Sequence, residues 1–161
     1  AFRVGRVEPT ASEEAALTRL GDGFDFRTAA LVAKEDVAAV TAALTSRAGA
    51  LEGRDPGTTS IRDETPSSVT IATDGTTPAL LVLADLAFPG WRARLDGHAA
   101  PVLTVDGVLR GVVVPVGAHV VTFRYRPMSL LVGALMSALA LVALVPYGRS
   151  SARAHGSGGR V

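Results

Sequence analysis

The stretch from Pro127 to Pro146 constrains this chain more than any other part of the sequence. It reads PMSLLVGALMSALALVALVP, and the 18 residues between the two prolines carry no charge. At a rise of about 1.5 Å per residue they would form roughly 27 Å of helix, close to the thickness of a bilayer's hydrocarbon core. The sequence therefore predicts a single transmembrane helix over residues 127–146.

The residues that flank this stretch predict its orientation. The tail over residues 147–161 carries Arg149, Arg153 and Arg160 and no acidic residue. Basic flanks tend to stay in the cytoplasm, so the tail is expected there and residues 1–126 outside. Arg124 and Arg126 on the other flank work against this orientation. The Gly and Ser content of the tail predicts disorder.

Small residues repeat along one face of the predicted membrane helix. Ser129, Gly133 and Ser137 follow one another at intervals of four. Such a stripe allows two helices to approach closely, which predicts packing against other transmembrane helices of the same or a partner protein.

The preceding 126 residues have the pattern of a mainly β domain. Helices are expected near residues 12–20, where Thr10 and Glu13 fit a capping box, and near 37–47. Residues 79–84 are apolar throughout and predict a strand buried on both faces. The turns at 96–97 and 106–107, both Asp-Gly, predict a β-meander over 79–126. The expected fold is an antiparallel β-sandwich with one or two short helices, followed by the membrane helix.

Composition excludes several functional classes. Sixteen cationic and 15 acidic side chains leave a net charge of +1, and the cations are scattered, which argues against a nucleic-acid partner. There is no cysteine, so neither disulfides nor cysteine-based zinc sites are expected. The three histidines, His98, His119 and His155, stand far apart, so no metal or other cofactor is expected.

The candidate binding residues lie in the predicted meander. Trp91 alternates with Ala93 and Leu95, which predicts a place in the core, although an exposed Trp could instead stack on a sugar ring. Asp85 ends an apolar strand and is expected to pair with Arg92 or Arg110. The five candidates for binding are Trp91, Arg92, Arg94, Asp85 and Arg110.

No catalytic residue is recognisable from the sequence. Asp96 and Asp106 stand in turns, where Asp is expected for backbone reasons. Spacing alone reveals no Ser, His and Asp arrangement.

Six segments in the second half of the β region, among them the run FPGWRA, form a recognisable pattern. They are residues 81–85, 88–93, 95–97, 109–115, 117–119 and 123–127. In order and spacing these segments resemble the C-terminal part of YfhO-like bacterial membrane proteins, which group with the polyprenyl-phosphate-dependent (GT-C-type) glycosyltransferases. Residues 2–32 also resemble the loop that precedes the sandwich in that family. The resemblance implies an exported β-domain at the end of a multi-spanning enzyme in the bacterial cell membrane. The catalytic acid of such enzymes lies on an early loop that has no counterpart here.

Two functions are therefore expected. The first is an extracytoplasmic accessory domain and last transmembrane helix of a glycosyltransferase-like protein that modifies cell-envelope glycans, non-catalytic by itself. The chain begins at Ala1 without a signal peptide, which favours an exported domain that follows upstream helices. The alternative is a membrane-tethered carbohydrate-binding or protein-interaction module with no attached enzyme. The expected partners are the bilayer, other transmembrane helices, and cell-envelope glycan or lipid-linked sugar.

Overall fold

The structure, a computed structural model, describes residues 1–45 and 57–154, without the side chains of 128, 130, 131 and 145–154. The chain divides into two units, Ala1–Tyr125 and Arg126–Val161. The first unit, called the β-domain below, contains two sheets and two helices. The second contains the helix α3 (Met128–Ala154).

A six-stranded sheet forms the middle layer of the β-domain. Its strand order is β1 (Phe2–Val4), β6 (Ala79–Leu86), β10 (Leu109–Val114), β9 (Leu103–Val105), β3 (Ala29–Ala33) and β2 (Arg6–Thr10). β1 and β2 lie at opposite ends of this order, yet only Gly5 separates them in the chain. Because consecutive Cα atoms are about 3.8 Å apart, the two edges must come close together, so the sheet curls.

A five-stranded sheet covers one face of the first. Its order is β4 (Thr58–Thr65), β5 (Ser68–Asp74), β11 (His119–Tyr125), β7 (Trp91–Leu95) and β8 (His98–Ala100). All four pairings between its strands are antiparallel.

The predicted single meander over 79–126 is wrong, although two of its hairpins are present. β7 pairs with β8 across the turn at 96–97, and β9 pairs with β10 across the turn at 106–107. The chain changes sheet between these hairpins, and also after β6 and after β10. The chain passes from the five-stranded to the six-stranded sheet at Pro101, with β8 ending before it and β9 beginning after it. Proline has no amide hydrogen to donate to a ladder, which makes it a natural point for the crossing.

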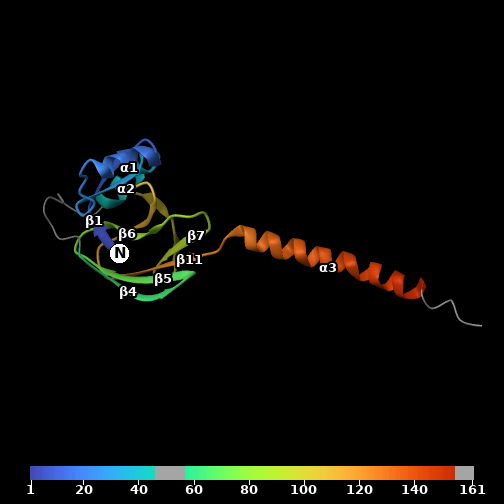
Figure 1. Cartoon of the computed structure of the whole chain (residues 1–161). Helices are drawn as coiled ribbons and strands as arrows, with labels where there is room; N and C mark the ends of the chain where they lie inside the picture. The colour runs from blue at the N-terminus through green and yellow to red at the C-terminus, as the bar shows by residue number, and fades with distance from the viewer. Residues whose placement is uncertain (46–56, 155–161) are drawn as a thin grey trace, which may run out of the picture. The chain divides into compact units, whose positions relative to one another are not determined.

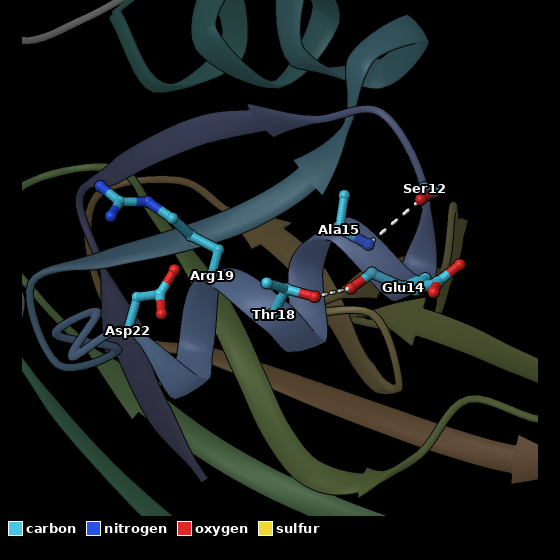
Figure 2. Close-up of a pocket in the computed structure, with 6 residues that line it drawn as sticks. All are labelled: Ser12, Glu14, Ala15, Thr18, Arg19 and Asp22. Carbon is cyan, nitrogen blue, oxygen red and sulfur yellow. Dashed lines mark hydrogen bonds between the residues drawn. The ribbon is translucent and has the colours of Figure 1, made fainter.

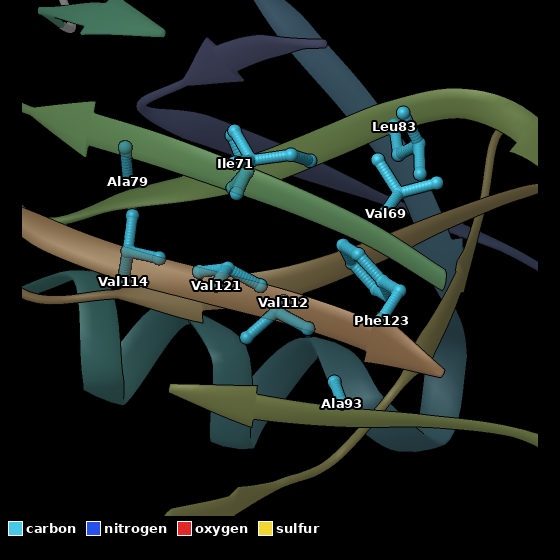
Figure 3. Packing of buried hydrophobic residues seen from close by; sticks show 10 residues of the cluster. Val69, Ile71, Ala79, Leu83, Ala93, Val112, Val114, Val121 and Phe123 are labelled. Atoms are coloured by element: carbon cyan, nitrogen blue, oxygen red, sulfur yellow. The ribbon is translucent and has the colours of Figure 1, made fainter. Parts of the chain in front are cut away.

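The main core lies between the two sheets. Figure 3 shows side chains from both sheets pointing toward one another, with Phe123 beside Val69 and Leu83. β6 contributes residues to this core and to a second cluster on the opposite face of its sheet. The prediction that residues 79–84 are buried on both faces is therefore confirmed for 79–83, which are all buried.

Two helices lie on the far side of the six-stranded sheet from β4 and β5 (Figure 1). α2 (Lys34–Thr45) buries Val40 and Leu44 in the second cluster, and α1 (Glu13–Gly21) buries Ala16. The predicted helix at 12–20 is α1, but its cap is Ser12 and not Thr10, because the Ser12 hydroxyl accepts the Ala15 amide at 3.1 Å. The helix predicted at 37–47 is α2. It begins three residues earlier, directly after β3, and positions 46 and 47 lie outside the described residues.

The predicted fold class is confirmed at a coarse level, since the β-domain is mainly β and resembles a β-sandwich. One detail is wrong: β2 and β3 are parallel, from Arg6 opposite Ala29 to Thr10 opposite Ala33. Parallel neighbours need a crossover connection, and α1 supplies it here.

The second unit consists of α3. Among the residues that the structure describes, no helix is both long enough and apolar enough to count as a membrane span, so the predicted transmembrane helix is not confirmed. α3 runs past Pro146 to Ala154, which corrects the disorder expected for 147–154. Pro removes one helical hydrogen bond, and the Arg and Ala residues that follow favour helix. Positions 155–161 lie outside the described residues.

Candidate functional site

A buried arginine lies at one end of the β-domain. β10 places Arg110 between the sheets, where it is fully buried. Its guanidinium forms an ion pair with Asp85 on β6 and donates a hydrogen bond to the Leu86 carbonyl at 3.1 Å. Asp85 is half exposed, so the pair connects the core to the surface. The expected Asp85–Arg110 pair is thus present.

Aromatic rings cover the rest of this guanidinium. The Cζ of Arg110 lies 3.5 Å from the centre of the Trp91 ring and 5.6 Å from that of Phe123. The Trp91 and Tyr125 rings are 5.2 Å apart. Trp91 packs against the core between the sheets, as its alternation with Ala93 and Leu95 predicted. This arrangement provides cation–π contacts in a desolvated place, where they are strongest.

The electrostatics of the cluster are those of a structural ion pair. Burial lowers the pKa of Arg110, and Asp85 acts in the opposite direction. The Nε of Arg110 has no hydrogen-bond partner within the described part of the chain. One carboxylate bound to one guanidinium, with no nucleophile in contact, supplies no acid and base pair for catalysis.

Arg92 and Arg94 are not part of this cluster. They alternate with Trp91 and Ala93 along β7, so they project from the outer face of the five-stranded sheet, where both are exposed. Arg92 lies directly opposite Arg124 of β11. Arg94 donates a hydrogen bond to the Gly97 carbonyl at 2.7 Å. The five candidates therefore separate into a buried group of three and an exposed pair.

A second polar cluster, not expected from the sequence, joins Asp96 and His119. Nδ1 of His119 lies 2.6 Å from one Asp96 oxygen, and Nε2 lies 3.1 Å from the Val116 carbonyl. The other Asp96 oxygen accepts the Val120 amide at 2.8 Å. The Asp-Gly turn at 96–97 was the available signal, but no spacing rule links it to a histidine 23 residues away.

The pKa values of this pair follow from those bonds. The hydrogen bond to Asp96, aided by that to Val116, raises the pKa of His119 above 6.5. The Val120 amide and then His119 lower the pKa of Asp96 below 3.8. With both ring nitrogens engaged, His119 acts as a clamp between β7 and β11 and has no free nitrogen to serve as a base.

A polar hollow of about 330 Å³ lies beside this clamp. Its polar lining includes Thr58, Ser60, Arg62 and Asp74, whose side chains make no hydrogen bond within the described residues. These groups are free to bind a hydroxylated or charged ligand.

Asp106 fixes another turn. Its carboxylate accepts the Leu31 amide at 2.8 Å, and its own amide donates to the Leu31 carbonyl at 2.8 Å. Burial raises the pKa of Asp106, while the Leu31 bond lowers it. The backbone role expected for both Asp96 and Asp106 is confirmed.

A larger hollow of about 440 Å³ lies along α1 (Figure 2). Four of its six lining residues are joined by hydrogen bonds of the helix and its cap: the Ala15 amide donates to the Ser12 hydroxyl, and the Thr18 hydroxyl donates to the Glu14 carbonyl. The other two lining residues are Arg19 and Asp22. The hollow is an open, hydrophilic helix surface, and its six lining residues do not form a catalytic arrangement.

The predicted packing stripe on α3 has no neighbour among the described residues. Ser129, Gly133 and Ser137 are exposed, and a methyl group added at Gly133 would meet nothing within 4 Å. Helix packing there stays a prediction. Within residues 1–45 and the described part of 57–154, no three His, Asp or Glu side chains cluster as a metal site would require.

Comparison with known proteins gives no relative. Protein-family models, curated proteins and solved structures each return no match to this chain.

Proposed function

We propose that this chain is the extracytoplasmic accessory domain and last transmembrane helix of a multi-spanning glycosyltransferase-like protein that modifies cell-envelope glycans. The enzyme class rests on the resemblance of residues 81–127 to YfhO-like membrane proteins. The β-domain is non-catalytic in this proposal and supports the enzyme or guides its acceptor at the outer surface of a bacterial cell membrane.

One observation supports the membrane part of the proposal. Seven large apolar side chains of α3 are each more than half exposed: Val132, Leu135, Met136, Leu139, Leu141, Val142 and Leu144. They point in all directions around the helix, since their spacing follows no single face. Leaving this much apolar surface in water is unfavourable by about 25 cal/mol for each Å². The sequence between Pro127 and Pro146 has no charge that would oppose burial in lipid.

The non-catalytic role is supported by how the polar groups of the β-domain are used. Arg110 and Asp85 neutralise each other, and both nitrogens of His119 are engaged. These two polar clusters therefore hold neighbouring strands together.

Extraction with alkaline carbonate tests the membrane part. The full chain should stay with the membrane pellet, whereas a variant with Leu135→Lys and Leu139→Lys should be released. Each charge at the centre of a span costs about 2.5 to 3.5 kcal/mol for insertion. Leu17→Lys, at an exposed apolar position of the β-domain, is the matched control and should not change retention. Release of the unaltered chain would overturn the proposal.

Orientation has its own test. Green fluorescent protein fused after Val161 should fluoresce, because it folds in the cytoplasm, and a cysteine introduced at Thr18 should react with an impermeant thiol reagent from outside. The chain has no cysteine of its own to interfere. The opposite pattern would place the β-domain in the cytoplasm and exclude the proposed role.

A second function is favoured by the hollow beside Asp96 and His119, namely a tethered carbohydrate-binding module. Its unpartnered hydroxyl, carboxylate and guanidinium groups suit a sugar. Chemical-shift changes confined to Thr58, Ser60 and Asp74 on titration with cell-envelope oligosaccharides would support this function, and no shift at millimolar sugar would exclude it.

A further inference from the structure

An exposed surface lies where β11 ends and the chain leaves the β-domain. We call this surface the exit edge. It comprises Leu86, Phe88, Trp91, Arg92, Arg124 and Tyr125. Trp91 is opposite Tyr125, and Arg92 is opposite Arg124, on the adjacent strands β7 and β11 (Figure 1).

Apolar side chains project from the turn that precedes β7. Phe88 is 58 % exposed and Leu86 is 45 % exposed. Their position is fixed, because the Trp91 amide donates to the Phe88 carbonyl, and the Leu86 carbonyl accepts from buried Arg110. The turn is thus a rigid apolar projection beside the half-buried rings of Trp91 and Tyr125.

The two arginines of the exit edge lack acidic partners. Neither Arg92 nor Arg124 forms an ion pair or a side-chain hydrogen bond within the described residues. Like charges directly opposite on neighbouring strands destabilise a sheet. An anionic group bound by both Arg92 and Arg124 would offset the repulsion between them. The two arginines are therefore suited to an anionic partner.

The short connection between β11 and α3 indicates which anionic partner lies nearby. Two residues, Arg126 and Pro127, separate Tyr125 from the start of α3. At no more than about 3.6 Å per residue, the end of β11 lies within about 11 Å of the first residue of that helix. If α3 enters a bilayer, as the proposed function states, Tyr125 lies within reach of the lipid headgroups, so these are anionic groups that the exit edge can bind.

We infer that the exit edge docks on anionic phospholipid headgroups, with Phe88 and Leu86 inserted at the interface and Arg92 and Arg124 bound to lipid phosphates. Aromatic residues prefer this level of a membrane, and cationic side chains there are attracted to an anionic leaflet. The inference rests on the proposed membrane insertion of α3 and adds the orientation of the β-domain on the surface.

Labelling of single cysteines tests the docking. The full chain is labelled with a fluorophore at Phe88→Cys, and a second sample is labelled at Val116→Cys as the control. Both are reconstituted in nanodiscs whose lipid headgroups carry a spin label that quenches the fluorophore. Val116 is also exposed but precedes β11, so it lies about 20 Å from Tyr125 along the strand. In discs with phosphatidylglycerol the Phe88 label should be quenched several-fold more than the Val116 label. Equal quenching of the two labels would overturn the inference.

Charge variants test the partner. Arg92→Gln with Arg124→Gln should lower the ratio of docked to undocked domain about 30-fold, from the attraction of two cationic side chains to an anionic surface. Arg27→Gln with Lys34→Gln removes two exposed charges elsewhere and should leave quenching unchanged. Equal quenching in discs of phosphatidylcholine alone would exclude anionic lipid as the partner.

Carbonate extraction of the same samples separates two failures. A chain that is released refutes the proposed function and this inference together. A chain that is retained but shows no preferential quenching at Phe88 refutes the docking alone.

Discussion

At the scale of single residues, the decisive feature of Arg110 is that it is fully buried and forms an ion pair with Asp85. Breaking a buried pair by removing one partner costs about 3 to 5 kcal/mol, whereas replacing both partners by apolar groups is often neutral. Because Asp85 is half exposed, water compensates part of its loss, and we expect Asp85→Asn to cost about 2 kcal/mol. Adding Arg110→Met to that variant should restore stability. A double-mutant cycle from urea unfolding, followed by the single Trp91, measures this coupling, and additive effects would contradict it.

His119 makes the stability of the β-domain depend on pH. Its pKa is raised in the folded state by Asp96, so its contribution is complete below about pH 6.5 and is lost as pH rises through the folded pKa. The pKa of Asp96 is lowered, so its contribution is lost as pH falls below 3.8 through the folded value. The melting temperature should therefore fall from slightly acidic to alkaline pH in the unaltered chain. His119→Gln should flatten that decline, whereas His98→Gln should keep it. An identical profile for His119→Gln would show that the clamp is not charged.

The sequence revealed part of the site at this scale. A cationic partner for Asp85 could be expected in advance, because an acid at the end of an apolar strand needs a cation nearby, but the sequence left Arg92 and Arg110 open and the structure shows Arg110. The cation–π contact with Trp91 could not, since it depends on which strands of the two sheets lie above one another. The Asp96–His119 bond was missed for the same reason: it joins neighbouring strands whose pairing no local pattern specifies.

At the scale of elements, the two Asp-Gly turns provide a matched pair. Asp96 and Gly97 have φ of 49° and 82°, and Asp106 and Gly107 have 51° and 79°. A methyl group at Gly97 meets nothing within 4 Å, whereas one at Gly107 lies 3.1 Å from the Glu13 carbonyl and 3.2 Å from Ala16 of α1. Gly97→Ala should therefore cost about 1 to 2 kcal/mol from the left-handed backbone alone. Gly107→Ala should cost more, because α1 must also shift. Equal changes in melting temperature would argue against the contact with α1.

Arg92 and Arg124, the cross-strand pair at the exit edge, are expected to lower the stability of the β-domain although they serve its inferred binding to lipid. Arg92→Thr removes repulsion from Arg124 and introduces a residue favoured in strands, so it should stabilise the β-domain by about 0.2 to 1 kcal/mol. Arg27→Thr, outside the sheets, should leave stability nearly unchanged. Thermal unfolding by circular dichroism distinguishes these variants. A destabilised Arg92→Thr would mean that Arg92 has a stabilising role within the fold.

Element identity was predicted better than pairing. The periodicity of β6 and β7 and the Asp-Gly turns depend on neighbours in the chain, and these features are present where expected. The single meander was wrong because pairing depends on how two sheets exchange strands, and Pro101 marks a crossing that the sequence alone presents as a minor interruption. The parallel β2–β3 pair was likewise hidden, since a strand's residues do not report the direction of its neighbour.

At the scale of the whole molecule, the β-domain should fold without α3, and α3 should be the unit that attaches the chain to a membrane. Every buried apolar residue of the described core belongs to Ala1–Tyr125, whereas α3 has exposed apolar side chains between Val132 and Leu144. A chain ending at Pro127 should therefore remain in the supernatant after ultracentrifugation and unfold cooperatively on heating. The full chain should require detergent or lipid to stay dispersed. Circular dichroism of the shortened chain in plain buffer provides the measurement, with the full chain in detergent as its control. A shortened chain that aggregates or shows no transition would mean that α3 is needed to complete the fold, and α3 would then have to be regarded as part of the β-domain's core instead of its tether.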